Sequence, residues 1–420
     1  MFSSRALYNI GLWLLLPYVF FHLVWRSFRQ PEYLEHVGER FGFYGASVDR
    51  PVIWLHTVSV GETRAAASLV QRLRKEYPGH QLVLTHTTPT GRAASEQLFG
   101  SDVLRVYLPY DYPFAVARFL RHFRPAIGIL METEIWLNLI SECHAARIPL
   151  LLLNARLSEK SAAGYARFSG LTQTCLQRLT AIAAQTEADA LRLLKLGAPS
   201  VPVMGNLKFD IMPPQALLEL GGRLRDLFGA NRSIFLAAST RDGEEALVLD
   251  ALADCNIPGL LVVVVPRHPQ RFAEVADMIE RRGLRLQRRS ENLPVNPGTR
   301  VVLGDSMGEM FAYYAACDLA LIGGSLLPFG GQNLIEACSV GKPVLIGPHT
   351  YNFAQASEQA VSEGAALRLA SAAELPELLQ RLFAHPEDME RMAQAGTRFV
   401  AAHRGATEVA LRIVRQHLAA

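Results

Sequence analysis

The stretch PVIWLHTVSVGETRAAASLV, residues 51–70, changes character twice within twenty residues. An apolar run ends at Leu55, a turn with polar and titratable side chains follows, and an alanine-rich segment continues from Arg64. A short buried strand that leads through a polar turn into a helix is the repeating unit of parallel α/β sheets. If the unit recurs, this stretch predicts the fold class of the whole chain.

The alternation of apolar runs and helical patterns does recur, and it restarts after GNLKFDIMPP, Gly205–Pro214, whose Gly, Asn and double Pro are typical of a linker. The predicted strands are Val52–Leu55, Leu82–His86, Ala126–Leu130, Leu150–Asn154 and Ala181–Ala184 in the first half, and Ile234–Ala238, Leu260–Val265, Val301–Leu303, Leu319–Ile322 and Val344–Ile346 in the second. The predicted helices of the first half include Arg64–Glu76, Arg92–Phe99, Pro113–Phe123 and Glu187–Leu196.

Two such series predict an α/β fold with two tandem Rossmann-like domains behind an N-terminal anchor helix. The predicted boundaries are an anchor over 1–29, a first domain over 30–205, a second domain over 206–386 and C-terminal helices over 387–420. These C-terminal helices could pack back on the first domain instead of extending the second. Ligands of such sheets bind beyond the carboxyl ends of the strands, so functional residues are expected on loops that follow strands, in a cleft between the domains.

Composition indicates a globular chain and limits its partners. Of the 420 residues, 50% are hydrophobic and 19% are charged, which excludes a disordered chain. The net charge of +3 does not indicate a nucleic-acid partner, and it suits an anionic small molecule or an acidic membrane surface equally well. The five cysteines are widely spaced without a metal-ligand pattern, which predicts reduced thiols in the cytosol and no metal site.

The segment ALYNIGLWLLLPYVFFHLVW, Ala6–Trp25, carries no formal charge over twenty residues. As a helix it would be roughly 30 Å long, about the thickness of the hydrocarbon core of a bilayer. Arg26 and Arg29 follow it and Arg5 alone precedes it, which predicts that the bulk of the chain lies in the cytosol. The segment is therefore predicted to be a membrane anchor that spans the bilayer or, given Pro17, lies in its plane. A buried core helix is the alternative.

Ser59-Val60-Gly61-Glu62 in the opening stretch has two interpretations. It fits the S-x-x-E capping box, in which the Glu carboxylate accepts a hydrogen bond from the Ser59 amide at a helix start. It also places a carboxylate after a strand, where a general base could reach a ligand. Because a carboxylate bent back on Ser59 is poorly placed to take a proton from a substrate, the two roles of Glu62 are expected to exclude each other.

Two further features of the first half could contribute to a site. GILMETEIWLNLI places Glu132 and Glu134 after the strand Ala126–Leu130, where paired carboxylates can position a substrate or share protons with a base, or simply start a helix. GNLKFD places Lys208 at the domain junction, where it faces either the cleft or the solvent.

The second half carries features that suit a phosphate-bearing ligand. LLVVVVPRHPQRF places Arg267 and His268 after the most apolar strand of the chain, and Arg forms forked contacts with phosphate or carboxylate groups. GDSMGEM, Gly304–Met310, is a turn between strand and helix that can offer backbone groups to a base or phosphate. LALIGGSLLPFGGQNLIEACSVGKPVLIGP, Leu319–Pro348, has two glycine pairs that let backbone amides approach an anion, with Glu336 in the first turn of the helix that follows.

Taken in order, these motifs resemble those of the 3-deoxy-D-manno-oct-2-ulosonic acid (Kdo) transferases of lipid A assembly, over essentially the whole chain. The family's motifs S-V-G-E, E-T-E-x-W, G-N-x-K-F-D, P-R-H-P-x-R-F, G-D-[ST]-M-G-E and G-G-x-N correspond to Ser59–Glu62, Glu132–Trp136, Gly205–Asp210, Pro266–Phe272, Gly304–Glu309 and Gly330–Asn333.

The resemblance implies a GT-B type inverting glycosyltransferase that moves Kdo from CMP-Kdo to a glucosamine hydroxyl of the tetra-acylated lipid A precursor, lipid IVA. It implies no cofactor and no metal, and a place at the inner membrane with the catalytic domains on the cytoplasmic side. By motif match, Glu62 is the general base, and Glu132 and Lys208 are transition-state partners. The residues implied to bind CMP are Arg267, His268, Gly308, Glu309, Met310, Asn333, Leu334, Ile335 and Glu336.

The last motif departs from the usual G-G-H-N-P-L-E of the family, because Gln332 and Leu334-Ile335 interrupt it. Alternative functions are a glycosyltransferase that uses a UDP-sugar, a nucleotide-sugar epimerase on the same double fold, and a membrane-tethered nucleotide sensor without enzymatic activity. The chain contains no Walker G-x-x-x-x-G-K-[ST] pattern, no G-x-S-x-G elbow and no D-x-D pair.

Overall fold

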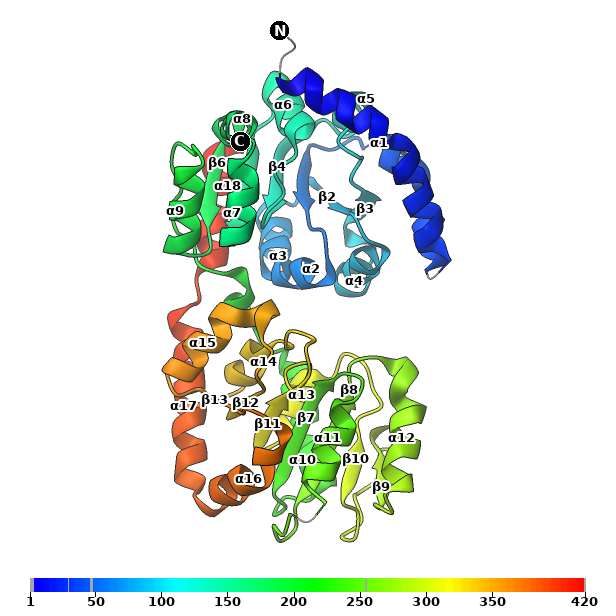
Figure 1. The fold of residues 1–420 in the computed structure, drawn as a ribbon, viewed down its shortest axis with the longest axis vertical. Coiled ribbons are helices and arrows are strands. Elements are labelled where there is room, and N and C mark those ends of the chain that lie inside the picture. Colours follow the sequence, from blue (N-terminus) through cyan, green and yellow to red (C-terminus); the bar gives the residue numbers. More distant parts are fainter. Residues whose placement is uncertain (1–3, 29, 46–47, 254, 419–420) are drawn as a thin grey trace. The chain divides into compact units, whose positions relative to one another are not determined.

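The computed structural model describes residues 4–28, 30–45, 48–253 and 255–418, and the chain divides into two compact units (Figure 1). Unit 1 comprises Met1–Asp210 together with His403–Ala420, and unit 2 comprises Ile211–Ala402. The chain therefore crosses between the units twice, the first time after Asp210.

Unit 1 is built on a six-stranded sheet in the order β3-β2-β1-β4-β5-β6, in which all paired strands run parallel. Its strands are β1 (Val52–His56), β2 (Gln81–His86), β3 (Leu104–Tyr107), β4 (Pro125–Met131), β5 (Leu150–Ala155) and β6 (Ala181–Ala184). The five strands predicted for this half are confirmed to within one residue at each end. The edge strand β3 was missed because Leu104 and Arg105 are only half-buried. The sequence of this strand therefore contains no continuous apolar run that would indicate a strand.

Helices cover both faces of the first sheet, and the alanine-rich segment that follows β1 forms two of them. The predicted helix Arg64–Glu76 in fact begins at Val60 and breaks at Ala66. The helices of unit 1 are α1 (Ser4–Ser27), α2 (Val60–Ala65), α3 (Ala67–Glu76), α4 (Pro89–Phe99), α5 (Pro113–Phe123), α6 (Leu137–Ala145), α7 (Glu159–Ala166), α8 (Ser169–Arg178), α9 (Glu187–Lys195) and α18 (Ala406–His417).

Unit 2 is built on a seven-stranded parallel sheet in the order β13-β12-β11-β7-β8-β10-β9. Its strands are β7 (Ile234–Thr240), β8 (Leu261–Pro266), β9 (Leu286–Arg288), β10 (Val301–Leu303), β11 (Leu319–Ile322), β12 (Val344–Ile346) and β13 (Ala366–Arg368). The five predicted strands are confirmed, and the fold class is an α/β fold with two parallel sheets, as predicted. The two missed strands, β9 and β13, are short, partly exposed edge strands.

The helices of unit 2 are α10 (Gln215–Phe228), α11 (Glu244–Ala251), α12 (Phe272–Arg281), α13 (Met310–Ala316), α14 (Leu334–Ser339), α15 (Ala354–Ser362), α16 (Leu375–Ala384) and α17 (Pro386–Ala402). The inner strands of both sheets are almost entirely buried between these layers. All five cysteines are buried free thiols, as expected for core residues.

The segment predicted to be a linker is bound to unit 1 over its first six residues. Asn154 at the end of β5 accepts a hydrogen bond from the Leu207 amide on Oδ1 (3.1 Å), and Gln185 after β6 accepts one from the Asn206 side chain (3.0 Å). The carboxylate of Asp210 accepts from the backbone amides of Gly405 and Thr407 at the start of α18. The last helix of the chain therefore completes unit 1, where it packs on α3.

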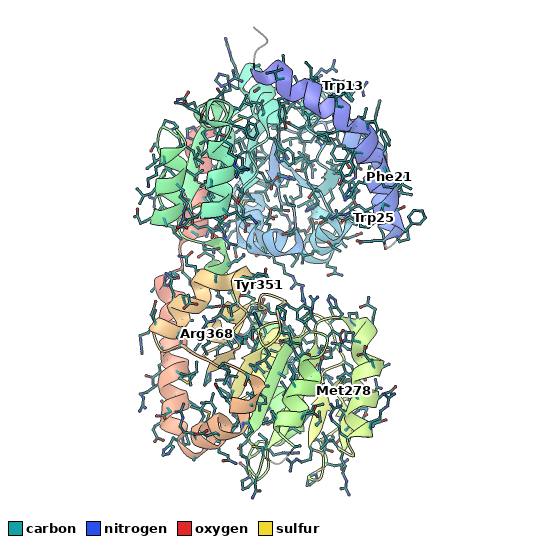
Figure 2. All side chains as sticks on the ribbon, viewed as in Figure 1. Trp13, Phe21, Trp25, Met278, Tyr351 and Arg368 are labelled. Carbon is teal, nitrogen blue, oxygen red and sulfur yellow. The ribbon has the colours of Figure 1, made fainter. Side chains whose placement is uncertain are left out.

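Helix α1 is long and apolar enough to cross a membrane by its length and composition. It lies along unit 1 across α5 and α6 (Figure 1), and Figure 2 labels Trp13, Phe21 and Trp25 on it. Arg29 and residues 1–3 of the predicted anchor lie outside the described residues.

Candidate functional site

The predicted site residues of unit 1 lie close to the switch point of the sheet, where the strand order changes direction between β1 and β4. Strand β1 pairs with β2 on one side and β4 on the other, so the loops that follow β1 and β4 flank this switch point. Ligands of open α/β sheets bind in the crevice that such a reversal creates. Glu62 lies on α2 after β1, whereas Glu132 and Glu134 follow β4 directly.

Glu62 is held by the start of its own helix. Ser59 is the N-cap of α2, and its hydroxyl accepts a hydrogen bond from the Glu62 amide (3.4 Å). The Glu62 carboxylate accepts from the Val58 amide on Oε2 (2.8 Å) and from the Ser59 hydroxyl on Oε1 (3.0 Å). The capping arrangement predicted for this motif therefore exists, but the carboxylate binds the Val58 amide instead of the Ser59 amide.

The Glu62 carboxylate also has the proton affinity of a general base. Burial, followed by the charge of Glu132, raises its pKa from 4.5 to about 7, although the contacts to Val58 and Ser59 act in the opposite direction. A base works best when its pKa lies near the working pH. The capping contacts therefore leave the carboxylate with a pKa near neutrality, and the expectation that capping and proton transfer exclude each other stays a prediction.

Glu132 and Lys208 form an ion pair beside Glu62, with Nζ of Lys208 3.8 Å from Oε1 of Glu132. Glu132 has a left-handed backbone conformation with φ of 61°, and Asn154, which holds the Lys208 segment, has φ of 54°. Residues other than Gly adopt this backbone conformation at a cost of about 1–3 kcal/mol, and such residues cluster at functional sites. The structure thus brings together the three residues predicted to be catalytic: Glu62, Glu132 and Lys208.

His56, the last residue of β1, belongs to the polar turn of the opening stretch, but sequence reasoning assigned it no role. Its imidazole is fully buried, and Nδ1 lies 3.0 Å from the Thr85 carbonyl oxygen, whereas Nε2 lies 3.8 Å from Oε2 of Glu134. The Trp136 indole donates to the same Glu134 oxygen (2.6 Å). Glu134 is therefore hydrogen-bonded by Trp136 and lies close to His56 without a hydrogen bond, and its charge contributes to the raised pKa of Glu62. The position of His56 at a strand end was the available signal.

The predicted CMP-binding residues all belong to unit 2. They follow β8, β10 and β11, which share the central part of the sheet with β7 in the order β11-β7-β8-β10. Because the paired strands are parallel, the loops that follow them meet at one edge.

Arg267 and His268 lie in an electropositive part of this edge. The pKa of His268 is lowered from its ordinary value by burial and by the nearby guanidinium groups of Arg241, Arg267 and Arg271. Arg271 is neutralised by Glu245, 2.7 Å away. Arg241 follows β7 and was missed by sequence reasoning, although its position after a predicted strand was a signal.

Glu336 and Arg267 lie near the same buried side chain, Tyr314. The pKa of Tyr314 is raised by burial and by the charge of Glu336, and Arg267 opposes this effect. Asn333 is the N-cap of α14, accepts from the Ile335 amide (3.1 Å) and donates to Glu336 (3.1 Å). The structure therefore groups Arg267, Asn333 and Glu336.

The remaining predicted residues offer mostly backbone groups. The side chains of Leu334 and Ile335 are buried in the core, so any contact with a ligand is left to their main chain. Gly308 has a left-handed φ of 79°, in the turn before α13. The Glu309 carboxylate accepts from the Ser306 hydroxyl (2.6 Å) and pairs with Arg289 (3.4 Å), a residue that no sequence motif indicated.

The glycine-rich loop after β11 is organised by one buried carboxylate. Glu244, which is 1% exposed, accepts on Oε2 from the Arg241 and Gly324 amides (2.9 and 2.5 Å). Its Oε1 accepts from the Leu326 amide (2.9 Å) and, more weakly, from the Leu327 amide (3.4 Å). Glu244 therefore connects the start of α11 to the loop that leads to Asn333, and it was missed because a carboxylate at a helix start is common.

We expect Glu244→Gln to destabilise this loop, because an amide NH₂ group would face backbone N–H donors that are then left unsatisfied. Loss of such contacts costs about 1–3 kcal/mol. Denaturant unfolding of full-length protein should show a lower midpoint, and calorimetry should show weaker CMP binding. Asp250→Asn on the same helix, which breaks only an exposed pair with Arg282, is the matched control and should change neither. An unchanged unfolding midpoint in Glu244→Gln would contradict the assignment.

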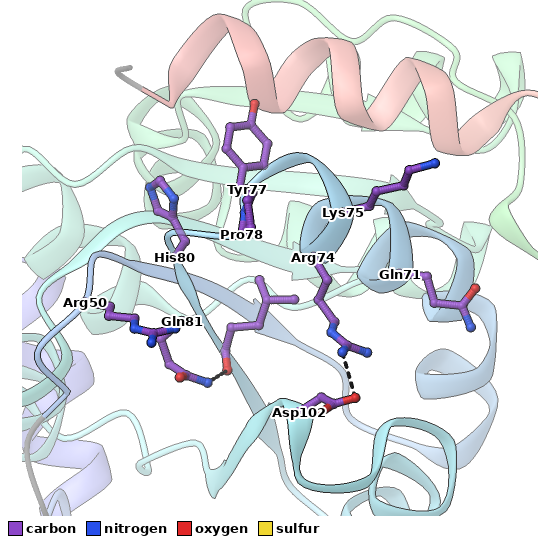
Figure 3. Close-up of a pocket in the computed structure, with 10 residues that line it drawn as sticks. Arg50, Gln71, Arg74, Lys75, Tyr77, Pro78, His80, Gln81 and Asp102 are labelled. Carbon is purple, nitrogen blue, oxygen red and sulfur yellow. Dashed lines mark hydrogen bonds and ion pairs between the residues drawn. The ribbon is translucent and has the colours of Figure 1, made fainter.

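A hollow of about 440 Å³ lies at the opposite edge of the first sheet (Figure 3). It is bounded by Arg50, two residues before β1, by the end of α3 and by the first residues of β2, and the ion pair between Arg74 and Asp102 (2.6 Å) lies at one side. Its lining residues are Arg50, Gln71, Arg74, Lys75, Tyr77, Pro78, His80, Gln81, Leu82 and Asp102. Because it lies at the amino ends of the strands, it is not part of the candidate site.

Among the described residues, no group of three or more His, Cys, Asp and Glu side chains is placed to hold a metal ion.

The chain matches two known families. Residues 35–211 match the family described as 3-deoxy-D-manno-octulosonic-acid transferase (kdotransferase), and residues 247–399 match glycosyl transferases group 1. The 3-deoxy-D-manno-octulosonic acid transferase of Bordetella pertussis is 40% identical, with 96% of this chain and 97% of the relative covered. The enzyme of the same name from Haemophilus influenzae is 37% identical, with 99% of both chains covered.

Solved structures with low identity share the fold. A glycosyltransferase from Rickettsia africae is 14% identical with a TM-score of 0.59, covering 88% of this chain and 99% of that one. The UDP-GlcNAc 2-epimerase of Neisseria meningitidis is 17% identical with a TM-score of 0.58, covering 87% and 100%. These likenesses establish the two-domain glycosyltransferase-type fold and nothing about the reaction.

Proposed function

Because this chain belongs to the 3-deoxy-D-manno-octulosonic acid (Kdo) transferase family, we propose that it transfers Kdo from CMP-Kdo to a glucosamine hydroxyl of lipid IVA with inversion at the anomeric carbon. The chain is a glycosyltransferase, and identity of 37–40% over nearly its full length to two Kdo transferases is the observation that carries the proposal. The donor, the acceptor and the residue roles below are parts of the proposal.

Glu62 acts as the general base. Its carboxylate takes the proton from the acceptor hydroxyl while that oxygen forms the new bond to the anomeric carbon of Kdo and the bond to CMP breaks. The Val58 amide and Ser59 hydroxyl hold the carboxylate in one orientation, which limits the entropy lost when the acceptor binds. The pKa of about 7 leaves a substantial fraction of Glu62 ionised and ready to accept a proton.

Glu132 and Lys208 support the transition state. Their ion pair places one negative and one positive group beside Glu62, and the cation can stabilise negative charge as the reaction proceeds. The strained backbone of Glu132 indicates that its side-chain direction matters enough to offset a conformational cost.

The unit 2 residues bind the CMP moiety. Arg267 supplies positive charge to the phosphate, which gains negative charge as CMP departs, and His268 donates a hydrogen bond to it as a neutral imidazole. Glu336 accepts from the ribose hydroxyls, and Gly308, Glu309, Met310, Asn333, Leu334 and Ile335 surround the nucleotide with backbone groups. The guanidinium groups near His268 support the phosphate assignment, because they concentrate positive charge at this edge.

The proposal is tested by incubating purified protein and lipid IVA in detergent with CMP-Kdo or with UDP-sugars, followed by mass spectrometry of the lipid. We expect lipid IVA to gain the mass of Kdo only with CMP-Kdo. Transfer from a UDP-sugar would indicate the alternative glycosyltransferase, conversion of a nucleotide sugar without lipid would indicate an epimerase, and CMP binding without turnover would indicate a sensor.

The pH dependence of transfer provides a second test. Because only ionised Glu62 can act as base, the turnover number should rise with pH through a midpoint near 7. Glu132→Gln removes a charge that raises this pKa, so the rising limb should move to lower pH, whatever happens to the maximal rate. Glu159→Gln, at the exposed start of α7 and not among the groups that shift the pKa of Glu62, should leave the midpoint in place. A midpoint that stays near 7 in Glu132→Gln would contradict the coupling between the two carboxylates.

We place the protein at the inner membrane, with both units on the cytoplasmic side and α1 as its membrane contact. The support is the apolar character of α1 together with the lipid nature of the proposed acceptor.

A further inference from the structure

The polar side chains of the first turns of α1 contact unit 1. Arg5 donates from Nε to Asn138 (3.0 Å) and pairs with Glu142, both on α6. The amide group of Asn138 donates in turn to Asn9 of α1 (2.7 Å). Two successive turns of α1 are therefore attached to one helix of the folded unit.

A buried carboxylate strengthens this attachment. Asp111 accepts from the Tyr8 hydroxyl (2.9 Å) and from the backbone amides of Asn138 and Leu139 in the first turn of α6 (3.0 and 2.8 Å). The Tyr112 hydroxyl donates to the Leu12 carbonyl oxygen of α1 (2.8 Å). The group that caps α6 thus also holds α1, and breaking the contact with Tyr8 would disturb the interior of unit 1.

The opposite face of α1 is apolar and exposed. Leu14 and Phe21 are 77% and 69% exposed and lie seven residues apart, which places them on one face of α1. Phe28, which is 82% exposed, follows directly after the end of the helix. The other large apolar side chains exposed along α1 are Leu7, Ile10, Trp13, Leu15, Tyr18, Phe20, Val24 and Trp25. In the first turns of α1, therefore, polar side chains contact the protein, whereas large apolar side chains are exposed along the whole helix. Leu23, near the end of the helix, is buried.

We propose that α1 lies in the plane of the membrane surface as a fixed part of unit 1, with this apolar face in the lipid, and does not cross the bilayer. A helix that crossed would carry Arg5 about 30 Å through the hydrocarbon, away from Asn138 and Glu142. The contacts of residues 5–12 and a membrane-crossing α1 are mutually exclusive, provided that unit 1 stays in water.

The lipid surface fits this face better than a second protein chain does. Residues 4–28 contain no Asp or Glu, and the exposed Arg26 ends the helix, which suits anionic headgroups. Trp13, Tyr18 and Trp25 are side chains that favour the boundary between headgroups and hydrocarbon. The face extends for about 36 Å, since 24 residues rise about 1.5 Å each. An uncharged aromatic strip of this length matches helices that lie in a membrane interface.

This inference deepens the proposed function, because a helix fixed to unit 1 would hold Glu62, Glu132 and Lys208 at a constant height above the leaflet that carries the lipid acceptor. The two are nevertheless separable. Transfer to detergent-dispersed lipid IVA tests the reaction, whereas the experiments below test only how α1 meets the membrane.

The first experiment determines on which side of the membrane each end of the chain lies. Protease-cleavable tags are placed before Met1 or after Ala420, and digestion is compared in inside-out and right-side-out vesicles. We expect both tags to be cleaved only in inside-out vesicles, with the C-terminal tag as the matched control for the catalytic units. Cleavage of the N-terminal tag only in right-side-out vesicles would show that α1 crosses the bilayer and would overturn the proposal.

The second experiment identifies what covers the face. Leu14→Glu/Phe21→Glu should lower binding of the full chain to phosphatidylethanolamine–phosphatidylglycerol vesicles by about tenfold or more, with detergent-phase turnover within about twofold of the parent. Leu98→Glu/Phe168→Glu adds equal charge at exposed apolar positions elsewhere on unit 1 and should bind vesicles normally. Equal vesicle binding by both double variants would overturn the proposal. The proposal would also be overturned if light scattering without detergent showed a stable dimer that Leu14→Glu/Phe21→Glu abolishes and Leu98→Glu/Phe168→Glu does not, because a second copy of the chain would then cover the face.

Discussion

Glu62→Gln should lower the turnover number of transfer by roughly 100-fold or more while the protein stays folded and binds CMP normally. The amide oxygen of Gln can still accept from the Val58 amide, so the start of α2 is retained. A neutral amide cannot take a proton from the acceptor hydroxyl, so the chemical step loses its base. Three measurements separate the contribution of Glu62 to helix capping from its contribution to proton transfer. They are turnover with CMP-Kdo and lipid IVA, thermal unfolding, and calorimetry of CMP binding.

Glu187→Gln is the matched control for this experiment. Glu187 also lies in the first turn of a helix behind a Thr186 N-cap in unit 1, but it is exposed and far along the chain from the switch point. It should leave turnover unchanged. If Glu62→Gln retained turnover within a few-fold of the parent, the carboxylate would be only a cap. If it lost stability and turnover together, the loss of activity would be a consequence of unfolding.

Arg267→Ala and Glu336→Ala should each weaken CMP binding by about 10- to 150-fold, because each removes a charge-assisted contact worth roughly 1.5–3 kcal/mol. Titration calorimetry with CMP measures this loss without the acceptor. Arg267→Ala should also make the affinity less dependent on salt, since a charge that pairs with phosphate is lost.

Two exposed residues of unit 2 serve as controls for charge alone. Arg281→Ala and Glu363→Ala change the net charge by the same amounts at helix ends away from the predicted nucleotide edge, and both should bind CMP normally. Unchanged CMP affinity in both Arg267→Ala and Glu336→Ala would remove these residues from the nucleotide site.

The central strands could be predicted from the sequence because burial on both faces produces continuous apolar runs such as Leu261–Pro266. The edge strands β3, β9 and β13 could not, since one exposed side allows residues such as Arg105 and Arg288 within the strand. Local sequence also suggested a free linker at Gly205–Pro214. The contacts that bind its first half come from Asn154 in β5 and from Gln185 directly after β6, 53 and 21 residues earlier in the sequence than their partners.

The candidate site was predictable where one residue follows one strand, as for Arg267 and Glu132. It was not predictable where its arrangement depends on groups that folding brings together from distant parts of the sequence. His56 meets Glu134 only because β1 and β4 are neighbours, and Glu244 reaches the loop after β11 from a helix some 80 residues earlier in the chain. The pKa of Glu62 is a further example, because it depends on burial and on Glu132.

The position of α18 affects how the protein is made. Domains generally fold as units while the ribosome extends the chain, with those nearest the N-terminus first. Unit 1 cannot follow this order, because the helix that packs on α3 and is capped by Asp210 is synthesised only after the whole of unit 2. Unit 2, which is continuous in sequence, can be finished while unit 1 still exposes the apolar groove meant for Ala410, Leu411 and Val414. A nascent chain that stalls or is cut short near residue 402 would therefore carry a complete second unit and an unfinished first one, a form that chaperones and proteases would recognise.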